Sequence, residues 1–263
     1  MRLLIDAGNS YTKWAWQPAQ PERTDDWQVH ALANADWIAG LPHAAPLHAA
    51  IAQASACLIS NVAGEAWLAA LPDTYNPSTC CVIESPATWG NVSNGYHSPA
   101  QLGSDRWCSL LAVWQQYQAS ALIVSLGTAM TLDYLQKTAP GGARFVGGTI
   151  QPGLRLMWRS LQQGAAQLKQ YDLDALTQQQ AHRQIEPWPT TSQQAMWQGC
   201  VTALVASICQ RYAELQSTDP EIRLILTGGD AALIHAALPD RLSAQAIIGD
   251  NLVLKGLAWM AHA

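Results

Sequence analysis

Several sequence signals of common protein classes are missing from this chain. The 14 Lys and Arg residues never form a run, and the formal net charge is −5, so nucleic acid is not expected as a main partner. The seven His residues show neither His-x-x-x-His nor His-Glu-x-x-His spacing, which argues against a zinc enzyme. Walker-type Gly-x-x-x-x-Gly-Lys-Ser/Thr, Gly-x-Gly-x-x-Gly and Gly-x-Ser-x-Gly patterns are also absent, which argues against three common kinds of nucleotide or hydrolase site.

Long apolar runs and paired cysteines are lacking as well. No apolar stretch approaches the roughly 18 to 20 residues of a membrane span, and Asp6 follows Arg2 too closely for a signal-peptide core. The six Cys residues have no Cys-x-x-Cys spacing and lie mostly among apolar residues, which indicates reduced, buried thiols. We therefore expect a cytoplasmic protein without a membrane partner. There is only one Phe against 12 Trp, and most Trp side chains are expected in a core or an interface.

The chain does have enough apolar sequence for a large folded core. Of its 263 residues, 49% are hydrophobic and 13% are charged, which is typical of a globular protein. Apolar runs of strand length alternate with segments of helical spacing, and this alternation predicts an α/β fold. Strands are expected at 2–5, 56–59, 80–83, 121–126, 144–150, 222–227 and 246–248, and helices at 103–119 and 192–216, the last capped by Thr191 or Ser192.

Residues 6–13, Asp-Ala-Gly-Asn-Ser-Tyr-Thr-Lys, form the most informative local pattern. An apolar run precedes Asp6 and apolar alternation resumes after Lys13, so the segment is typical of a strand, a turn at Gly8 and a second strand. Gly8 lets the backbone approach a ligand and aim N–H groups at it. A carboxylate, amide donors and a lysine on one hairpin suit the phosphates and Mg²⁺ of a nucleotide. The alternative is an ordinary hairpin with an Asp in its turn.

A second copy of this hairpin strengthens the interpretation. Residues 123–132, Ile-Val-Ser-Leu-Gly-Thr-Ala-Met-Thr-Leu, align on residues 4–13 without gaps, which pairs Thr131 with Thr12. Such a repeat predicts two similar halves with a boundary near residue 119, each half presenting a phosphate-binding hairpin to a nucleotide. The two copies match weakly as strings, so chance resemblance is the alternative.

Polar residues gather again at 103–106, Gly-Ser-Asp-Arg, where a helix is predicted to begin, shortly after Asn-Gly-Tyr at 94–96. Asp105 and Arg106 lie in the first turn of that helix, where converging backbone N–H groups favour an anionic ligand group. A carboxylate there can take a proton from a substrate hydroxyl, and the arginine can hold a polar or anionic substrate. The alternative is that Asp105 only begins the helix and pairs with Arg106.

Two later glycine pairs are each expected to follow an apolar strand. They are Gly147-Gly148, followed by Thr-Ile-Gln-Pro-Gly, and Gly228-Gly229, preceded by Thr and followed by Asp. A backbone can pass close to a ligand at such positions, although a plain strand-to-helix turn is the commoner case.

These motifs, in this order, resemble those of the type III pantothenate kinases, and the resemblance covers essentially the whole chain. That family belongs to the superfamily of acetate and sugar kinases, Hsp70 and actin. The resemblance implies two actin-like (ribonuclease H-like) α/β halves, residues 1–118 and 119–263, around a nucleotide cleft. It implies that ATP phosphorylates pantothenate at its 4′-hydroxyl, which gives 4′-phosphopantothenate in the first step of coenzyme A biosynthesis. It also implies a homodimer that uses Mg²⁺.

The same resemblance assigns roles to individual residues. Asp105 is implied as the general base that takes the proton of the 4′-hydroxyl, and Asp6 as the ligand of Mg²⁺, directly or through water. ATP contacts are implied for Asp6, Gly8, Asn9, Ser10, Lys13, Gly127, Thr128, Gly228 and Gly229. The pantothenate pocket is implied to comprise Tyr96, Gly103, Ser104, Asp105 and Arg106, with Ser192, and Thr191 beside it, closing the pocket of the other subunit.

One departure from the family concerns Ser125. The family often has Asp at this position, where it helps to bind a stimulating potassium or ammonium ion. Ser125 carries no charge, which weakens the expectation of a monovalent cation site.

Two other functions fit part of the pattern. One is a non-catalytic, ATP-binding accessory or regulatory protein on the same fold, and the retention of Asp6, Lys13, Asp105 and Arg106 argues against it. The other is a kinase of the superfamily that acts on a sugar or on acetate, and the combination of Tyr96 with the polar residues at the helix start argues against that.

Overall fold

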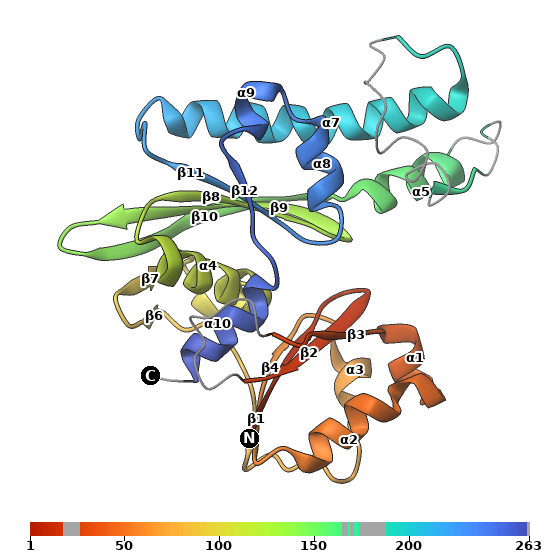
Figure 1. The fold of residues 1–263 in the computed structure, drawn as a ribbon, viewed down its shortest axis with the longest axis vertical. Helices are drawn as coiled ribbons and strands as arrows, with labels where there is room; N and C mark the ends of the chain where they lie inside the picture. Colours follow the sequence, from red (N-terminus) through yellow and green to blue (C-terminus); the bar gives the residue numbers. More distant parts are fainter. Residues whose placement is uncertain (18–26, 165–167, 169–170, 174–187, 262–263) are drawn as a thin grey trace. The chain divides into compact units, whose positions relative to one another are not determined.

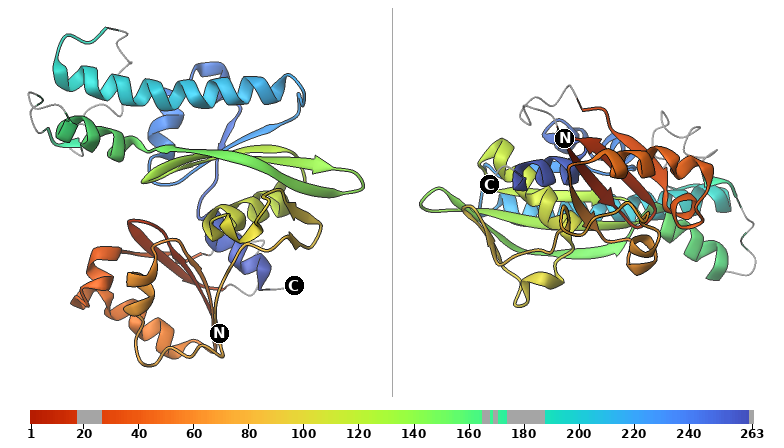
Figure 2. Two further views of the ribbon diagram at one scale, coloured as in Figure 1. Left: turned by 180° about the vertical axis from the view of Figure 1, so that it is seen from behind. Right: turned by 90° about the horizontal axis from the view of Figure 1, so that it is seen from below.

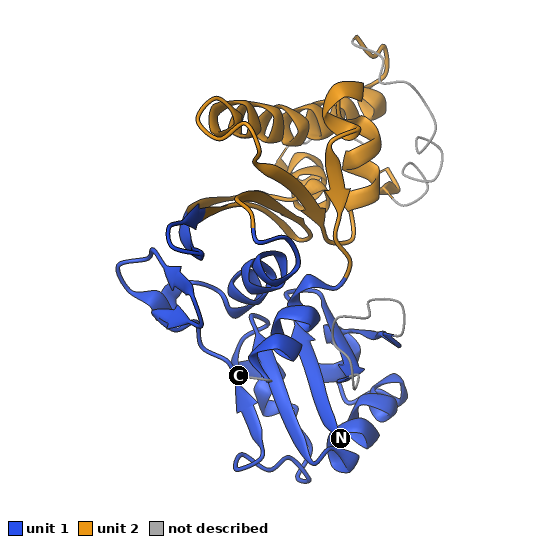
Figure 3. Cartoon of the chain, turned by 60° about the vertical axis from the view of Figure 1, so that its left-hand side comes forward, with its two compact units in different colours: residues 1–118, 137–146, 251–263 blue, residues 119–136, 147–250 orange. Residues whose placement is uncertain are grey.

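The computed structural model has an α/β fold made of two compact units (Figures 1 and 3). Unit 1 comprises residues 1–118, 137–146 and 251–263, and unit 2 comprises residues 119–136 and 147–250. Each unit contains parallel and antiparallel strands covered by helices, which confirms the predicted fold class. The structure describes residues 1–17, 27–164, 168, 171–173 and 188–261.

Unit 1 is built on a five-stranded sheet with the strand order β3-β2-β1-β4-β5. These strands are β1 (Arg2–Ala7), β2 (Tyr11–Trp16), β3 (His30–Ala33), β4 (Ala56–Asn61) and β5 (Cys80–Val82). Strand β2 is antiparallel to β1 and β3, whereas β4 is parallel to β1 and β5. Leu3, Leu4 and Ile5 are fully buried, because helices cover both faces of the central strand, and this explains the unbroken apolar run in its sequence.

Two groups of helices cover this sheet (Figure 1). The first comprises α1 (Asn34–Ile38), the 3₁₀ helix η2 (Pro42–Ala44), α2 (Ala45–Gln53) and α3 (Glu65–Ala69). Trp37 and Trp67 are fully buried in the core under this group. The second group, α4 (Ser104–Tyr117) and α10 (Leu252–Met260), packs against β1 and β4. The two helices come close enough that a Cβ at Gly256 would overlap the carbonyl of Cys108.

Short elements beside α4 complete unit 1. They are β6 (Thr88–Trp89), β7 (Val92–Asn94) and the 3₁₀ helix η3 (Pro99–Gln101). Strand β7 is antiparallel to β6, and its other neighbour is the segment Ala143–Phe145, with which it is parallel.

Unit 2 contains the strand order β12-β11-β8-β9-β10. The strands are β8 (Ala121–Leu126), β9 (Ala129–Thr138), β10 (Gly142–Pro152), β11 (Arg223–Thr227) and β12 (Ala246–Ile248), of which β9 and β10 belong to unit 2 except for residues 137–146. The helices are α5 (Leu154–Gly164), α7 (Ser192–Gln216), α8 (Ala231–Ala237) and α9 (Asp240–Ser243). Helix α7 lies along one face of this sheet (Figures 1 and 2). Leu204 and Ile208 of α7 share a buried core with Val124 and Leu224.

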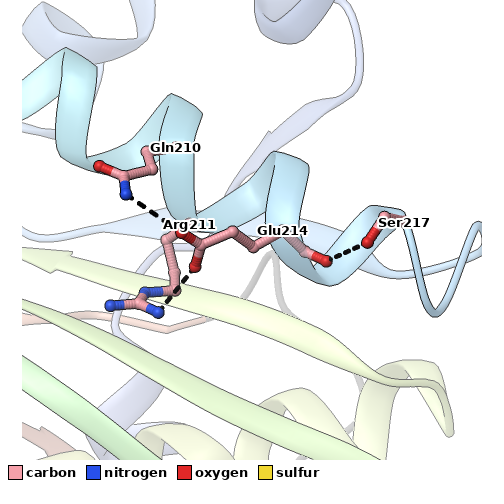
Figure 4. Close-up of polar contacts among 4 residues, drawn as sticks. All are labelled: Gln210, Arg211, Glu214 and Ser217. Carbon is pink, nitrogen blue, oxygen red and sulfur yellow. Dashed lines mark hydrogen bonds and ion pairs between the residues drawn. The ribbon is translucent and has the colours of Figure 1, made fainter.

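The outer side of α7 is polar. Arg211 and Glu214 form an ion pair of 2.7 Å, and Gln210 donates a hydrogen bond of 3.1 Å to the same carboxylate (Figure 4). Both charged side chains are about half exposed, and such pairs contribute only about 0.3–0.5 kcal/mol. The stability of α7 therefore comes mainly from its buried apolar face.

The helices predicted at 103–119 and 192–216 and the strand predicted at 121–126 are confirmed. The prediction that Gly147-Gly148 follows a strand was wrong, because both residues lie inside β10, which continues to Pro152. The division into similar halves at residue 119 stays a prediction. None of the helices that the structure describes is both long and apolar enough to cross a membrane.

Candidate active site

The hairpin formed by β1 and β2 places a side chain that can be negatively charged opposite a positively charged one. Asp6, near the end of β1, is the cross-strand partner of Lys13 on β2, so the predicted strand, turn and strand are confirmed. The loop between them contains the four residues 8–11. The N–H of Gly8 donates to the carbonyl of Tyr11 at 3.1 Å and so closes the turn, while Asn9 and Ser10 are exposed at its tip. The turn therefore keeps the N–H of Gly8 for itself.

Asp6 titrates far from its ordinary range. Burial and, to a smaller extent, the negative charge of Asp105 raise the pKa of Asp6 from 3.8 to about 7, although the positive charge of Lys13 lowers it. Two neighbouring carboxylates do not both ionise easily unless a cation lies near them, and without one they tend to share a proton. The pair therefore suits a bound cation, which would replace the proton.

A hydrogen bond between two hydroxyls holds the start of α4 beside Asp6. Ser60 on β4 is the register neighbour of Asp6 on β1, and its Oγ lies 2.9 Å from Oγ of Ser104, the first residue of α4. Both serines are buried. Ser104 thus links the first turn of α4 to the sheet, and the adjacent Asp105 is brought near Asp6.

The carboxylate of Asp105 is partly exposed, and the chain around it makes room for it. Its Oδ1 accepts a hydrogen bond of 2.7 Å from the N–H of Arg106, and a Cβ at Gly103 would lie only 2.6 Å from the same oxygen. Below it, burial and then the charges of Asp6 and Asp105 raise the pKa of the Cys108 thiol well above its ordinary value. Cys108 is therefore a neutral thiol near Asp6 and Asp105.

Arg106 is buried beside two aromatic rings. Its Nη1 donates to the hydroxyl of Tyr96 at 3.1 Å, and its Cζ lies 5.9 Å from the ring centroid of Tyr96 and 5.7 Å from that of Phe145. Oδ1 of Asn94 accepts the N–H of Tyr96 at 3.1 Å, and Gly95 lies so close to the carbonyl of Phe145 that it leaves no space for a side chain. Asn94 and Gly95 therefore position Tyr96 against Arg106.

The second hairpin, β8 and β9, differs from the first by one residue. Ser125 lies opposite Thr131, and the loop contains only the three residues 127–129. The alignment without gaps was therefore wrong beyond the turn. By its place across from the end of the first strand, Thr131 corresponds to Lys13 and not to Thr12.

Two glycines support this second hairpin within unit 2. The N–H of Gly153 donates to the carbonyl of Thr128 at 3.0 Å, and a side chain at Gly153 would overlap the hairpin backbone. Gly228 has φ +100° and lies against the backbone of Leu126, whereas a Cβ at Gly229 would meet open space. The turn after β11 therefore lies against the end of β8.

Ser125 has an acidic residue two positions along the paired strand, Asp133. Asp133 on β9 is 1% exposed, and its Oδ2 accepts a hydrogen bond of 3.0 Å from Thr131, the residue opposite Ser125. Neither Asp133 nor Phe145 belongs to a short motif, so no sequence signal marked them.

Thr191 and Ser192 lie at the start of α7 and are exposed. Thr191 is the predicted cap, because its Oγ1 accepts a hydrogen bond of 3.3 Å from the N–H of Gln194.

Known proteins with similar sequences identify the family of this chain. A family model described as type III pantothenate kinase matches residues 2–214. A protein described as type III pantothenate kinase from Methylobacillus flagellatus is 36% identical over 269 residues, which covers 98% of this chain and 96% of that protein.

Solved structures show the same fold at low sequence identity. A Campylobacter jejuni protein described as a Baf family transcriptional activator has a TM-score of 0.60 at 16% identity and covers 99% of this chain and 97% of that one. A Sinorhizobium meliloti protein described as a 2-dehydro-3-deoxygalactonokinase has a TM-score of 0.54 at 14% identity and covers 100% and 98%. At these identities the likeness concerns the fold alone.

Proposed function

Because this chain belongs to the type III pantothenate kinase family and phosphorylates pantothenate with ATP for coenzyme A biosynthesis, we propose that Asp105 is its general base. The observation that carries this assignment is the position of the Asp105 carboxylate. It lies at the first turn of α4, partly exposed, beside Asp6 and next to Arg106. From there Asp105 accepts the proton of the 4′-hydroxyl as that oxygen attacks the terminal phosphorus of ATP.

Asp6 is proposed to hold Mg²⁺, directly or through water. Oxygen ligands with negative charge suit this ion. Burial is the main cause of the raised pKa of Asp6, and the negative charge of Asp105 adds to it, so a cation beside the two carboxylates would stabilise ionised Asp6. When bound, Mg²⁺ neutralises charge on the phosphates. The ionised form of Asp6 is the form that binds.

The two hairpins are proposed to contact the phosphates of ATP. Lys13 brings the positive charge, and Asn9 and Ser10 present the exposed tip of the first turn. Gly8 shapes that turn. In unit 2 the corresponding contacts come from Gly127 and Thr128, while Gly228 and Gly229 border the adenosine.

Arg106 is proposed to bind the carboxylate of pantothenate, because a guanidinium matches a carboxylate in charge and geometry. Tyr96 fixes the guanidinium through its hydroxyl. Gly103 and Ser104 shape the same pocket by placing the start of α4.

The sharpest test replaces Asp105 with Asn and measures ADP release with and without pantothenate. Loss of a general base lowers turnover by about 10²- to 10⁴-fold, while the Kd for MgATP is expected to change by less than about threefold. Glu65→Gln is the matched control, because Glu65 lies in the first turn of α3 in the same unit and has no assigned role. If Asp105 only begins its helix, both variants lose some stability and neither loses turnover.

The accessory-protein alternative is not favoured, because the acids and bases that phosphoryl transfer uses are all present. Pantothenate-dependent ADP release by the wild-type protein separates it from the kinase. A panel of sugars and acetate in the same assay addresses the remaining substrates of the superfamily.

A monovalent cation fits this chain less well than Mg²⁺ does. Ser125 offers a hydroxyl and no charge, and the nearby Asp133 already accepts a hydrogen bond from Thr131. We propose that potassium or ammonium stimulates the wild-type enzyme by less than about twofold and that Ser125→Asp increases this response. Turnover in potassium-free buffer, with each ion then added, measures both.

We further propose a homodimer in the cytoplasm. All six Cys residues are free, which suits a reducing compartment, and Thr191 and Ser192 are exposed where a second subunit can meet them. Light scattering measures the assembly. If Ser192 serves the other subunit's pocket, each mixed dimer of Ser192→Arg and Asp105→Asn protein has one intact site of two, so an equal, randomly reassorted mixture regains about a quarter of the wild-type sites.

A further inference from the structure

Asn34 binds the turn of the first hairpin from outside at two points. Its side-chain Nδ2 donates to the carbonyl of Gly8 at 2.6 Å, and its backbone N–H donates to the carbonyl of Ser10 at 2.9 Å. Asn34 is the first residue of α1, directly after β3, and is 6% exposed. One buried residue therefore holds two of the carbonyl groups in a turn that is otherwise exposed.

The amide of Asn34 is itself fixed in orientation. Its Oδ1 accepts a hydrogen bond of 2.8 Å from the hydroxyl of Thr12, and that hydroxyl oxygen accepts one of 2.7 Å from Nε1 of Trp67 on α3. Thr12 and Trp67 are fully buried. Because Oδ1 is occupied by a donor, Nδ2 must face Gly8. Helices α1 and α3, which pack together beside β2 and β3 (Figure 1), thus set the amide in place.

The direction of a carbonyl determines the direction of the next N–H, because the peptide unit is planar and trans. With its oxygen on Asn34, the Gly8–Asn9 peptide directs the N–H of Asn9 away from Asn34. The Ser10–Tyr11 peptide does the same with the N–H of Tyr11. The carbonyls, which would repel a phosphate, are turned into the protein. The carbonyl of Ala7 is also turned into the protein, because it accepts hydrogen bonds from the N–H groups of Val62 and Ala63.

The second hairpin has a comparable support from a different group. There the backbone N–H of Gly153 holds the carbonyl of Thr128 in the turn. In both units a donor from outside the hairpin therefore binds a carbonyl of the phosphate turn.

We propose that Asn34 is a positioning residue for phosphate binding, which orients the N–H groups of Asn9 and Tyr11 toward the phosphates of ATP. This inference rests on the proposed role of the first hairpin in ATP binding. It adds the N–H of Tyr11 as a donor to phosphate. Asn34, Thr12 and Trp67 together hold the turn in the conformation that binds. Asn34 itself does not touch the nucleotide.

Two variants of Asn34 test this role. Asn34→Ser keeps the backbone N–H to Ser10 and removes the donor to Gly8 without adding charge. Asn34→Asp keeps the shape and places a carboxylate oxygen against the carbonyl of Gly8. Tyr75→Phe is the control, because it removes one side-chain hydrogen bond to a carbonyl, that of Cys80, in the same unit and lies outside the site.

The measurements are the Kd for MgATP by calorimetry without pantothenate, KM for both substrates, and the melting temperature. We expect both Asn34 variants to raise the Kd and KM for MgATP by about tenfold, with Asp the more severe, and to leave KM for pantothenate within about twofold. Tyr75→Phe lowers the melting temperature and leaves both KM values unchanged. A merely structural role of Asn34 would give its variants the same pattern as Tyr75→Phe.

Other outcomes overturn the proposal. Wild-type affinity for MgATP in the two Asn34 variants, or an equal rise of both KM values, contradicts it. Loss of folding in both variants also counts against it, because Asn34 would then serve the stability of unit 1 and not its hairpin. The binding measurement needs no turnover. If the wild-type protein binds MgATP but never consumes pantothenate, the kinase assignment fails and the inference on Asn34 is still decided.

Discussion

The carboxylate of Asp105 lies against the α-carbon of Gly103. A Cβ on Gly103 would come within 2.6 Å of Oδ1 of Asp105 and within 3.6 Å of Cγ1 of Val62. The backbone of Gly103, with φ −53° and ψ 135°, is one that any residue adopts. A side chain at this position would therefore displace the carboxylate of Asp105, and it would not strain the backbone.

Gly103→Ala is therefore expected to displace the Asp105 carboxylate while the helix still forms. A shift of the base by about 1 Å can lower kcat by up to about a hundredfold, and the Kd for MgATP should stay within about twofold. Gly199→Ala in α7 is the control, since nothing lies within 4 Å of a Cβ there. Steady-state kinetics compares the two, and an unchanged kcat in Gly103→Ala would mean that the carboxylate can move without cost.

Asp6 should make the ligand-free protein less stable as the pH rises. With its pKa near 7, native Asp6 keeps a proton that the unfolded chain, with a pKa of 3.8, has already lost. The native state thus binds more protons between these values, so its stabilisation is complete below about pH 4 and is lost as the pH approaches 7.

The measurement is the free energy of unfolding in urea at pH 5 and pH 8 for the wild-type protein and Asp6→Asn. Between these pH values the wild-type protein should lose about 2 kcal/mol more than the variant. MgATP should reduce the difference, because it favours ionised Asp6. Parallel pH dependences of the two proteins would contradict the shifted pKa.

Much of the site could be predicted because its residues are close in sequence. Asp6, Gly8 and Lys13 share one hairpin, and Asp105 and Arg106 share one turn, so local patterns reveal them. Loop length was harder to predict. A shift of one residue in a turn changes no apolar pattern, and only the pairing of Ser125 with Thr131 shows that the second loop is shorter.

The residues that support the site could not be predicted, because their contacts join distant parts of the chain. Asn34 begins a five-residue helix that left no periodic signal, and Phe145 on β10 contacts Arg106 on α4 from a distant part of the chain. The tryptophans are partly explained in the same way. Trp37 and Trp67 are fully buried under the first sheet, and Trp67 also donates to the network behind the hairpin.

Arg106→Lys is expected to weaken pantothenate binding although it conserves the charge. The guanidinium lies near the rings of Tyr96 and Phe145 and donates to the Tyr96 hydroxyl, and an ammonium group lacks its planar shape and its several donors. KM for pantothenate should rise by about tenfold or more, with the Kd for MgATP unchanged. Arg144→Lys, at an exposed position next to Phe145, is the control, and equal KM values in both variants would remove Arg106 from the pocket.

The adjacent glycines 228 and 229 should differ in their tolerance of a side chain. Gly228 has φ +100°, which L-residues rarely adopt, and its missing Cβ would overlap the backbone of Leu126. Gly229 has open space around it. Gly228→Ala combines backbone strain with overpacking and should cost about 3 kcal/mol, whereas Gly229→Ala should stay within about 0.5 kcal/mol.

Thermal and urea unfolding of the two variants without nucleotide measures this difference. The comparison isolates the close approach between the turn after β11 and the end of β8, because the two substitutions add the same methyl group one residue apart. If Gly228→Ala unfolds like Gly229→Ala, the turn can move away from Leu126 without loss. The Gly228–Gly229 backbone would then not be held where adenosine is proposed to bind.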